Sequence, residues 1–149
     1  MAVTAKWYGN GLLHIAKGDV SWKASGGSDI RVALCTSSYT PDQDAHDAYD
    51  DLTNEVSSSG TGYTTGGAAL TESDPTYDSA TNQMRLDAAD VTWSSSTITA
   101  RYAIIYAYNA TASLAYLLGY VDFGEDKVSS SGDFTITWDS TGVLRITAS

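Results

Sequence analysis

Apolar residues follow a helical period only near the start of the chain. Between residues 5 and 17 they recur about every 3.6 residues, at Ala5, Tyr8, Leu12, Ile15 and Ala16. Lys17 followed by Gly18 is typical of a helix end. Gly9 and Gly11 each disfavour the helix by up to about 1 kcal/mol relative to alanine. We therefore expect one N-terminal helix that depends on packing against the rest of the chain.

From residue 28 onward the apolar pattern alternates, which is typical of strands with one face against a core. The predicted strands lie near residues 30–35, 63–71, 84–86, 101–108, 114–121, 134–138 and 143–146. The 101–108 and 114–121 strands are predicted to form a hairpin, because both are rich in aromatic and aliphatic residues and lie close in sequence. The turn residues 139–142 predict a second hairpin between the two strands that flank them.

Several short strands joined by turns are typical of a β-sandwich or barrel. Thr40 is predicted to cap a short helical turn that begins at Pro41. Three serine triplets are predicted to be loop tips, at residues 57–59, 94–96 and 129–131. We therefore predict a mainly β protein, an antiparallel β-sandwich or barrel of jelly-roll type with one N-terminal helix and a short helical turn. Residues 1–149 are predicted to form a single domain, because no internal repeat or shift in composition divides them.

The charge of the chain disfavours two classes of partner. Eighteen acidic and 8 basic side chains give a formal net charge of −10. Because nucleic-acid affinity depends on Lys and Arg displacing counterions from phosphates, we expect no nucleic-acid partner. The basic residues are scattered, and no apolar run approaches the roughly 20 residues of a membrane-spanning helix. We therefore expect no membrane partner either.

Residue types that carry catalysis or bind metals are sparse or poorly spaced. The acidic segment 42–51 lacks the glycine and glutamate of a calcium-binding loop, and a solvated acidic loop explains it better. His14 and His46 are the only histidines, and no cysteine pair accompanies them. Cys35 lies in an alternating apolar run, so a buried, reduced thiol is predicted. We predict no catalytic, cofactor-binding or metal-binding residue, and hence no enzyme.

Two sequence blocks are specific beyond their periodicity, CTSSYTPDQD (Cys35–Asp44) and TWSSSTITARYAIIY (Thr92–Tyr106). They are accompanied by AKWYGNGLLHIAKGDVSW, TNEVSSSGTGYTTGGAAL and GYVDFGEDKVSSSGDFTITW. Together these blocks resemble a family of small virion structural proteins of tailed bacteriophages, and the resemblance extends over nearly the whole chain. It implies a head decoration (cement) protein that bridges neighbouring major capsid proteins and stabilises the shell. The family offers no catalytic residues to assign.

The resemblance also implies partners and a location. The expected partners are the major capsid protein and copies of the chain itself, as a homotrimer or another symmetric oligomer. The chain is expected to be made in the cytoplasm of the host bacterium and placed on the exterior of the virion head. Its acidity agrees with an exterior position, because a copy inside the shell would face packaged DNA.

Two other functions stay open at this stage. Related chains serve in the neck or tail, so a neck or tail component, as an adaptor or associated with fibres, is one alternative. A glycan-binding module displayed on the virion is the other, because a cleft lined by Trp93 and exposed tyrosines would form a carbohydrate platform. Most tyrosines of the two central strands are explained by cross-strand aromatic pairing within a sheet.

Trp7 and Tyr8 are the candidate interface residues. Two large aromatic residues precede the glycine-interrupted helix, and large aromatics are frequent anchors in protein interfaces. The alternative is that both side chains belong to the core of the chain.

Overall fold

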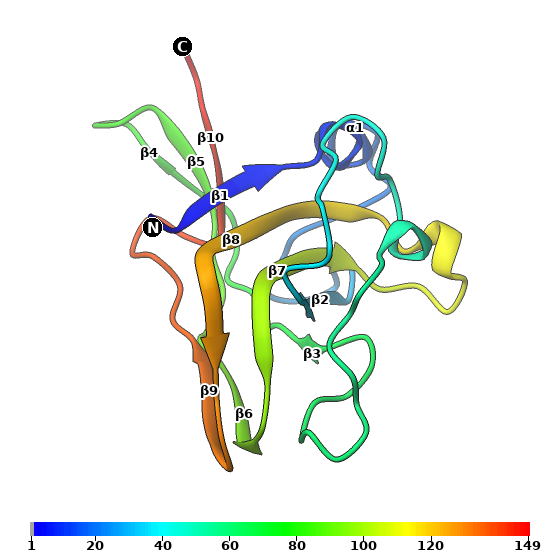
Figure 1. The fold of residues 1–149 in the computed structure, drawn as a ribbon. Coiled ribbons are helices and arrows are strands. Elements are labelled where there is room, and N and C mark those ends of the chain that lie inside the picture. Colours follow the sequence, from blue (N-terminus) through cyan, green and yellow to red (C-terminus); the bar gives the residue numbers. More distant parts are fainter. Residues whose placement is uncertain (1) are drawn as a thin grey trace.

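A computed structural model of the chain describes residues 2–149, with 41% of residues in strands and 10% in helices (Figure 1). The helical elements are α1 (Gly9–Lys17) and the 3-10 helices η1 (Tyr49–Asp51) and η2 (Ala112–Leu114). The strands are β1 (Thr4–Trp7), β2 (Ile30–Cys35), β3 (Ala68–Ala69), β4 (Thr76–Asp78), β5 (Gln83–Leu86), β6 (Val91–Ser96), β7 (Thr99–Ala107), β8 (Leu117–Val128), β9 (Gly132–Ile136) and β10 (Leu144–Thr147). The mainly β prediction is confirmed. None of the helices within residues 2–149 has the length and apolar character needed to cross a membrane.

The strands form three antiparallel sheets in a sandwich-like arrangement. The largest has five strands in the order β1-β8-β7-β2-β3. The two smaller sheets have the orders β10-β5-β4 and β6-β9. The main core contains residues from both the large and the small sheets, among them Val32, Ile105, Trp93, Phe134 and Leu144.

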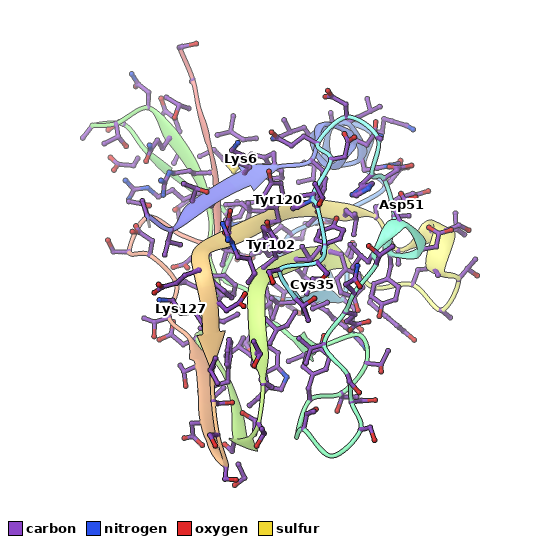
Figure 2. All side chains as sticks on the ribbon, in the orientation of Figure 1. Lys6, Cys35, Asp51, Tyr102, Tyr120 and Lys127 are labelled. Atoms are coloured by element: carbon purple, nitrogen blue, oxygen red, sulfur yellow. The ribbon has the colours of Figure 1, made fainter. Side chains whose placement is uncertain are left out.

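A second, aromatic cluster lies on the other face of the five-stranded sheet. It includes Tyr8, Cys35, Tyr39, Tyr106 and Tyr120, which come from β2, β7, β8 and the segments that follow β1 and β2. Figure 2 shows Cys35, Tyr102 and Tyr120 close to one another in the middle of the molecule. Strand β2 is therefore buried on both faces, whereas its alternating pattern predicted one buried face. The segment that follows β2 folds back over the sheet and covers the second face.

The N-terminal helix exists, but it begins later than its apolar pattern predicted. Thr4–Trp7 form strand β1, which pairs with β8, and α1 begins only at Gly9. Gly11 lies against β8, where an added Cβ atom would be 2.6 Å from the carbonyl oxygens of Leu117 and Leu118. The interior glycine that weakens the helix is therefore what allows the helix backbone to approach the sheet. Gly18, with φ of 82°, ends α1 as predicted.

The prediction of a central hairpin is confirmed, and the prediction of a C-terminal hairpin is wrong. Strands β7 and β8 pair antiparallel, with Ala103 opposite Val121. Strand β9 pairs with β6, and β10 pairs with β5, so the strands on either side of residues 139–142 do not pair with each other. The turn itself forms, with the Asp139 carboxylate accepting the Thr141 N–H at 2.8 Å. A local turn does not dictate pairing when each flanking strand packs its apolar residues against a different sheet.

Two further predictions about loops and strands are wrong. The strand predicted over residues 63–71 is reduced to β3, because Gly66 and Gly67 adopt positive φ angles of 89° and 77° and break the extended backbone. The Ser94–Ser96 triplet lies inside β6 and not at a loop tip. Ser96 is fully buried, and its hydroxyl lies 2.8 Å from that of Ser129.

The helical turn predicted at Thr40 is also corrected. The chain turns at residues 43–45, and the Asp42 carboxylate, not the Thr40 hydroxyl, accepts the N–H groups of Asp44 and Ala45 at 3.0 Å. These two bonds lower the pKa of Asp42, because they favour the ionised carboxylate. An aspartate two or three residues before the N–H groups it accepts is a common turn device.

Candidate interaction surface

An open groove of about 630 Å³ lies between β1, β8, β9 and the segment that runs from Trp138 to Arg145. Its lining is mainly apolar and includes Val3, Val121, Phe123, Phe134, Ile136 and Trp138. The groove exists because the chain leaves β9 in one small sheet and enters β10 in another. The connecting segment consequently forms one wall instead of closing the gap beside β1.

The groove lining includes two strongly exposed valines. It also carries both signs of charge. Val3 and Val128 are 61% and 67% exposed, although both line the groove. The charged lining residues are two cations and two anions, namely Lys127, Arg145, Asp133 and Asp139. This lining is electrically balanced on a chain whose net charge is −10. A contiguous exposed apolar area with a polar surround is typical of a protein interaction surface.

Strand β1 and strand β9 are both edge strands beside this groove. Strand β1 ends the five-stranded sheet, and β9 pairs only with β6. The outer backbone groups of an edge strand have no partner in the ladder and can accept another chain. Lys6 on β1 is exposed, and an exposed charged residue on an edge limits indiscriminate pairing.

Of the two predicted interface residues, Tyr8 is a core residue. It has no exposed surface, and its hydroxyl shares a hydrogen bond with the Tyr39 hydroxyl at 2.8 Å. Burial raises the pKa of Tyr8 far above the usual value for a phenol. The prediction that Tyr8 is available to a partner is therefore corrected. The backbone turns inward between β1 and α1, so consecutive residues face different surroundings.

Trp7 is half-buried and positions the wall of the groove. Its indole Nε1 donates to the carbonyl oxygen of Arg145 at 2.8 Å, and its ring packs against the main core. The Trp7 carbonyl in turn accepts a hydrogen bond from the Gln43 side chain at 2.6 Å. Trp7 thus links β1 to β10 and to the loop after β2. The apolar residues of the groove itself were not singled out from the sequence, because their alternation is the same as that of ordinary core strands.

The acidic segment and its histidines form bonds within the chain. The His14 ring nitrogens lie 2.8 Å from the Asp19 carboxylate and 2.9 Å from the Asp47 carboxylate. The ring stacks on Tyr116 with centroids 3.5 Å apart. Both ring nitrogens are therefore engaged by carboxylates of the same chain. His14 lowers the pKa of Asp19, and it joins α1 to the acidic segment instead of serving a substrate hydroxyl.

His46 lies at the end of a series of hydrogen bonds that begins at the buried Tyr8 hydroxyl. The Tyr8 hydroxyl shares a hydrogen bond with the Tyr39 hydroxyl, and the Tyr39 hydroxyl lies 2.8 Å from His46 Nδ1. The Asp42 N–H also points at His46 Nδ1, at 3.3 Å, which makes this nitrogen an acceptor. These hydrogen bonds order the segment that covers the aromatic cluster. Within residues 2–149, no serine or threonine takes part in them.

The Glu55 carboxylate accepts three hydrogen bonds next to the buried Cys35. Tyr49 donates to Oε2, while Tyr63 and the N–H of Gly66 donate to Oε1 at 2.6 and 2.7 Å. Cys35 has no exposed surface, and burial, followed by the charge of Glu55, raises its pKa to about 12. The thiol is therefore buried as predicted, and its thiolate is strongly disfavoured at neutral pH.

Two features considered from the sequence, a metal-binding cluster and a cleft at Trp93, are not found among residues 2–149. Within residues 2–149, no three His, Cys, Asp or Glu side chains are arranged to share a metal ion. Trp93 is only 7% exposed and packs its ring against Tyr63 and Phe134. A tryptophan inside the core cannot present its face to a sugar, so the cleft expected for a glycan-binding module does not form around it.

The chain was also compared with known proteins. No protein-family model, curated protein or solved structure matches it. Function must therefore be inferred from the residues of the chain and from their arrangement. The groove provides apolar residues, two of them strongly exposed, and balanced charges beside two strand edges.

Proposed function

We propose that this chain is a structural protein of a tailed bacteriophage, a head decoration protein that binds major capsid proteins on the outside of the shell. The resemblance of Cys35–Asp44 and Thr92–Tyr106 to virion structural proteins carries the proposal. The net charge of −10 supports an exterior position, because an acidic surface is repelled by packaged DNA.

The places of the two blocks in the fold fit a shared architecture. Cys35–Asp44 contains the end of β2 and Tyr39 of the aromatic cluster, and Thr92–Tyr106 contains most of β6 and β7. Cys35, Tyr39 and much of the β6–β7 block are buried, whereas most of residues 36–44 are exposed or half-buried, so the likeness includes part of the core. Most residues that line the groove lie in the accompanying block GYVDFGEDKVSSSGDFTITW, so the resemblance extends to the groove as well.

The proposed mechanism is stabilisation by binding alone. A protein that binds the assembled shell, and not isolated capsid subunits, lowers the free energy of the shell by mass action. A contact of about 800 Å² per partner is a standard size for a specific interface.

Electron microscopy of virions of the phage that encodes the chain tests this proposal. Density for the chain on the outer surface, in hundreds of copies, is the expected result. Six or twelve copies near the portal or tail would replace it with the neck or tail alternative. Absence of the chain from purified virions would overturn both assignments. Particles that lack the chain should also release DNA at lower temperature, and added purified protein should restore the native release temperature.

A further inference from the structure

We propose that the groove face is a self-association surface, and that the partner it receives is the groove face of a second copy of this chain. The inference goes beyond the proposed function, which concerns binding to capsid proteins. It does not depend on the virion or on the capsid protein as a partner. Residues of β1, β8, β9 and the Trp138–Arg145 segment form this groove face.

Charge determines where two copies of this chain can approach. Most of the surface is acidic, so two copies with a net charge of −10 repel each other over most orientations. The densest acidic segment, residues 42–51, lies away from the groove, and Figure 2 shows Asp51 and Lys127 on opposite sides of the molecule. The groove face carries Lys127 and Arg145 beside Asp133 and Asp139, so it is the balanced part of an acidic surface.

A balanced face is also complementary to itself. In a two-fold contact the same residues meet from both sides, so each cation of one copy can face an anion of the other. Asp133 is exposed, and its carboxylate forms no ion pair or side-chain hydrogen bond within residues 2–149, so its charge is available. Lys127 forms an exposed ion pair with Glu125, at 2.6 Å, and surface pairs of this kind contribute little to stability. Exchanging that neighbour for the Asp133 of a second copy therefore costs little.

The apolar part of the face supplies the driving force. Val3 and Val128 are the two most exposed aliphatic residues beside the groove, at 61% and 67%. Burial of apolar surface contributes about 25 cal/mol per Å² removed from water. The open edges of β1 and β9 lie at the same face, so backbone groups without ladder partners are available to the second copy.

Sedimentation of the purified full-length chain over a range of concentrations tests the inference. A concentration-dependent oligomer is expected, and Val128→Asp should weaken the association constant at least tenfold. Leu13→Asp is the matched control, because Leu13 is 51% exposed on α1, away from the groove. Its association constant should equal that of the native chain. A native chain that stays monomeric at millimolar concentration, or equal losses from both variants, would overturn the inference.

A charge exchange tests the pairing directly. Lys127→Glu leaves this face with excess negative charge, and Asp133→Lys leaves it with excess positive charge. Each variant alone should associate less than the native chain, and an equimolar mixture should associate at least as well as the native chain. A mixture that associates no better than the separate variants would contradict a contact through this face. Monomeric protein that still binds capsids would reject the inference and leave the proposed function intact. An oligomer that is absent from virions would reject the proposed function and leave the inference intact.

Discussion

The indole of Trp7 donates a hydrogen bond to the carbonyl oxygen of Arg145, across 138 residues of sequence. This bond joins the first strand of the chain to the last and fixes the position of β10 relative to β1. Arg145 and Ala5 of β1 both line the groove, so the bond joins two of the elements that form it. A residue chosen from the sequence as a partner anchor therefore positions the surface from within the chain.

Trp7→Phe removes the donor of this bond and keeps most of the ring. We expect the free energy of unfolding to fall by about 1 kcal/mol, the usual net value of one such hydrogen bond. Denaturant titration followed by circular dichroism measures the change. Tyr77→Phe is a control, because Tyr77 is 61% exposed and its hydroxyl bonds only to the Asn82 side chain. A loss for Tyr77→Phe as large as that for Trp7→Phe would contradict this explanation.

Gly11→Ala tests the close approach of α1 to β8. Alanine favours a helix by about 1 kcal/mol over glycine, but here its Cβ would be 2.6 Å from two carbonyl oxygens. We expect a net loss of about 1–3 kcal/mol, the range typical of overpacked sites. Gly9→Ala is the matched control in the same helix, since its Cβ would lie 3.4 Å from the nearest atom, the Gln43 carbonyl oxygen. Thermal unfolding of the two variants should differ clearly, and equal melting temperatures would contradict the packing argument.

His14→Gln tests the bonds that join α1 to the acidic segment. Glutamine can reach one carboxylate at most, and the stacking on Tyr116 is lost. We expect the free energy of unfolding to fall by about 1–2 kcal/mol, less than for fully buried charged bonds because Asp19 and Asp47 are partly exposed. Lys17→Gln removes only an exposed pair with Asp19 at 3.5 Å and should change stability by less than about 0.5 kcal/mol. An unchanged free energy of unfolding in His14→Gln would show that the bonds of His14 to Asp19 and Asp47 do not stabilise the fold.

The buried phenols and the thiol predict how stability depends on alkaline pH. Burial raises the pKa of Tyr8, Tyr39 and Tyr63 above the ordinary 10.0, and raises that of Cys35 from 9.0 to about 12. Above the ordinary values the unfolded chain releases protons that the folded chain retains, so stability decreases with rising pH. Denaturant titrations should give a constant free energy of unfolding up to about pH 9 and a steep decrease above it.

Two measurements check the origin of that decrease. Tyr39→Phe removes one buried phenol, so its free energy of unfolding should depend less steeply on pH between 10 and 12. The Cys35 thiol should react with a thiol reagent far more slowly in the folded than in the unfolded chain at neutral pH, because it has no exposed surface. A thiol that reacts equally fast in both states would contradict the burial on which the alkaline prediction depends.

The parts of the fold that could be predicted are those with local signals. The β7–β8 hairpin follows from two apolar strands separated by a short connection, and the end of α1 follows from Lys17 and Gly18. The pairing of β9 with β6 and of β10 with β5 could not be predicted, because the residues that meet are far apart in sequence. The different surroundings of Trp7, which is half-buried, and Tyr8, which is in the core, could not be predicted, because they depend on the path of the backbone between β1 and α1.

The sequence by itself determined the mainly β class, the single helix near the start, the acidic surface and the burial of Cys35, because periodicity, charge and composition act through local and additive effects. The tertiary structure alone decided which strands pair, why Gly11 is tolerated inside a helix, and where an apolar groove stays open. Those features depend on contacts between distant segments, and such contacts are selected by the packing of the whole chain and not by any segment of it.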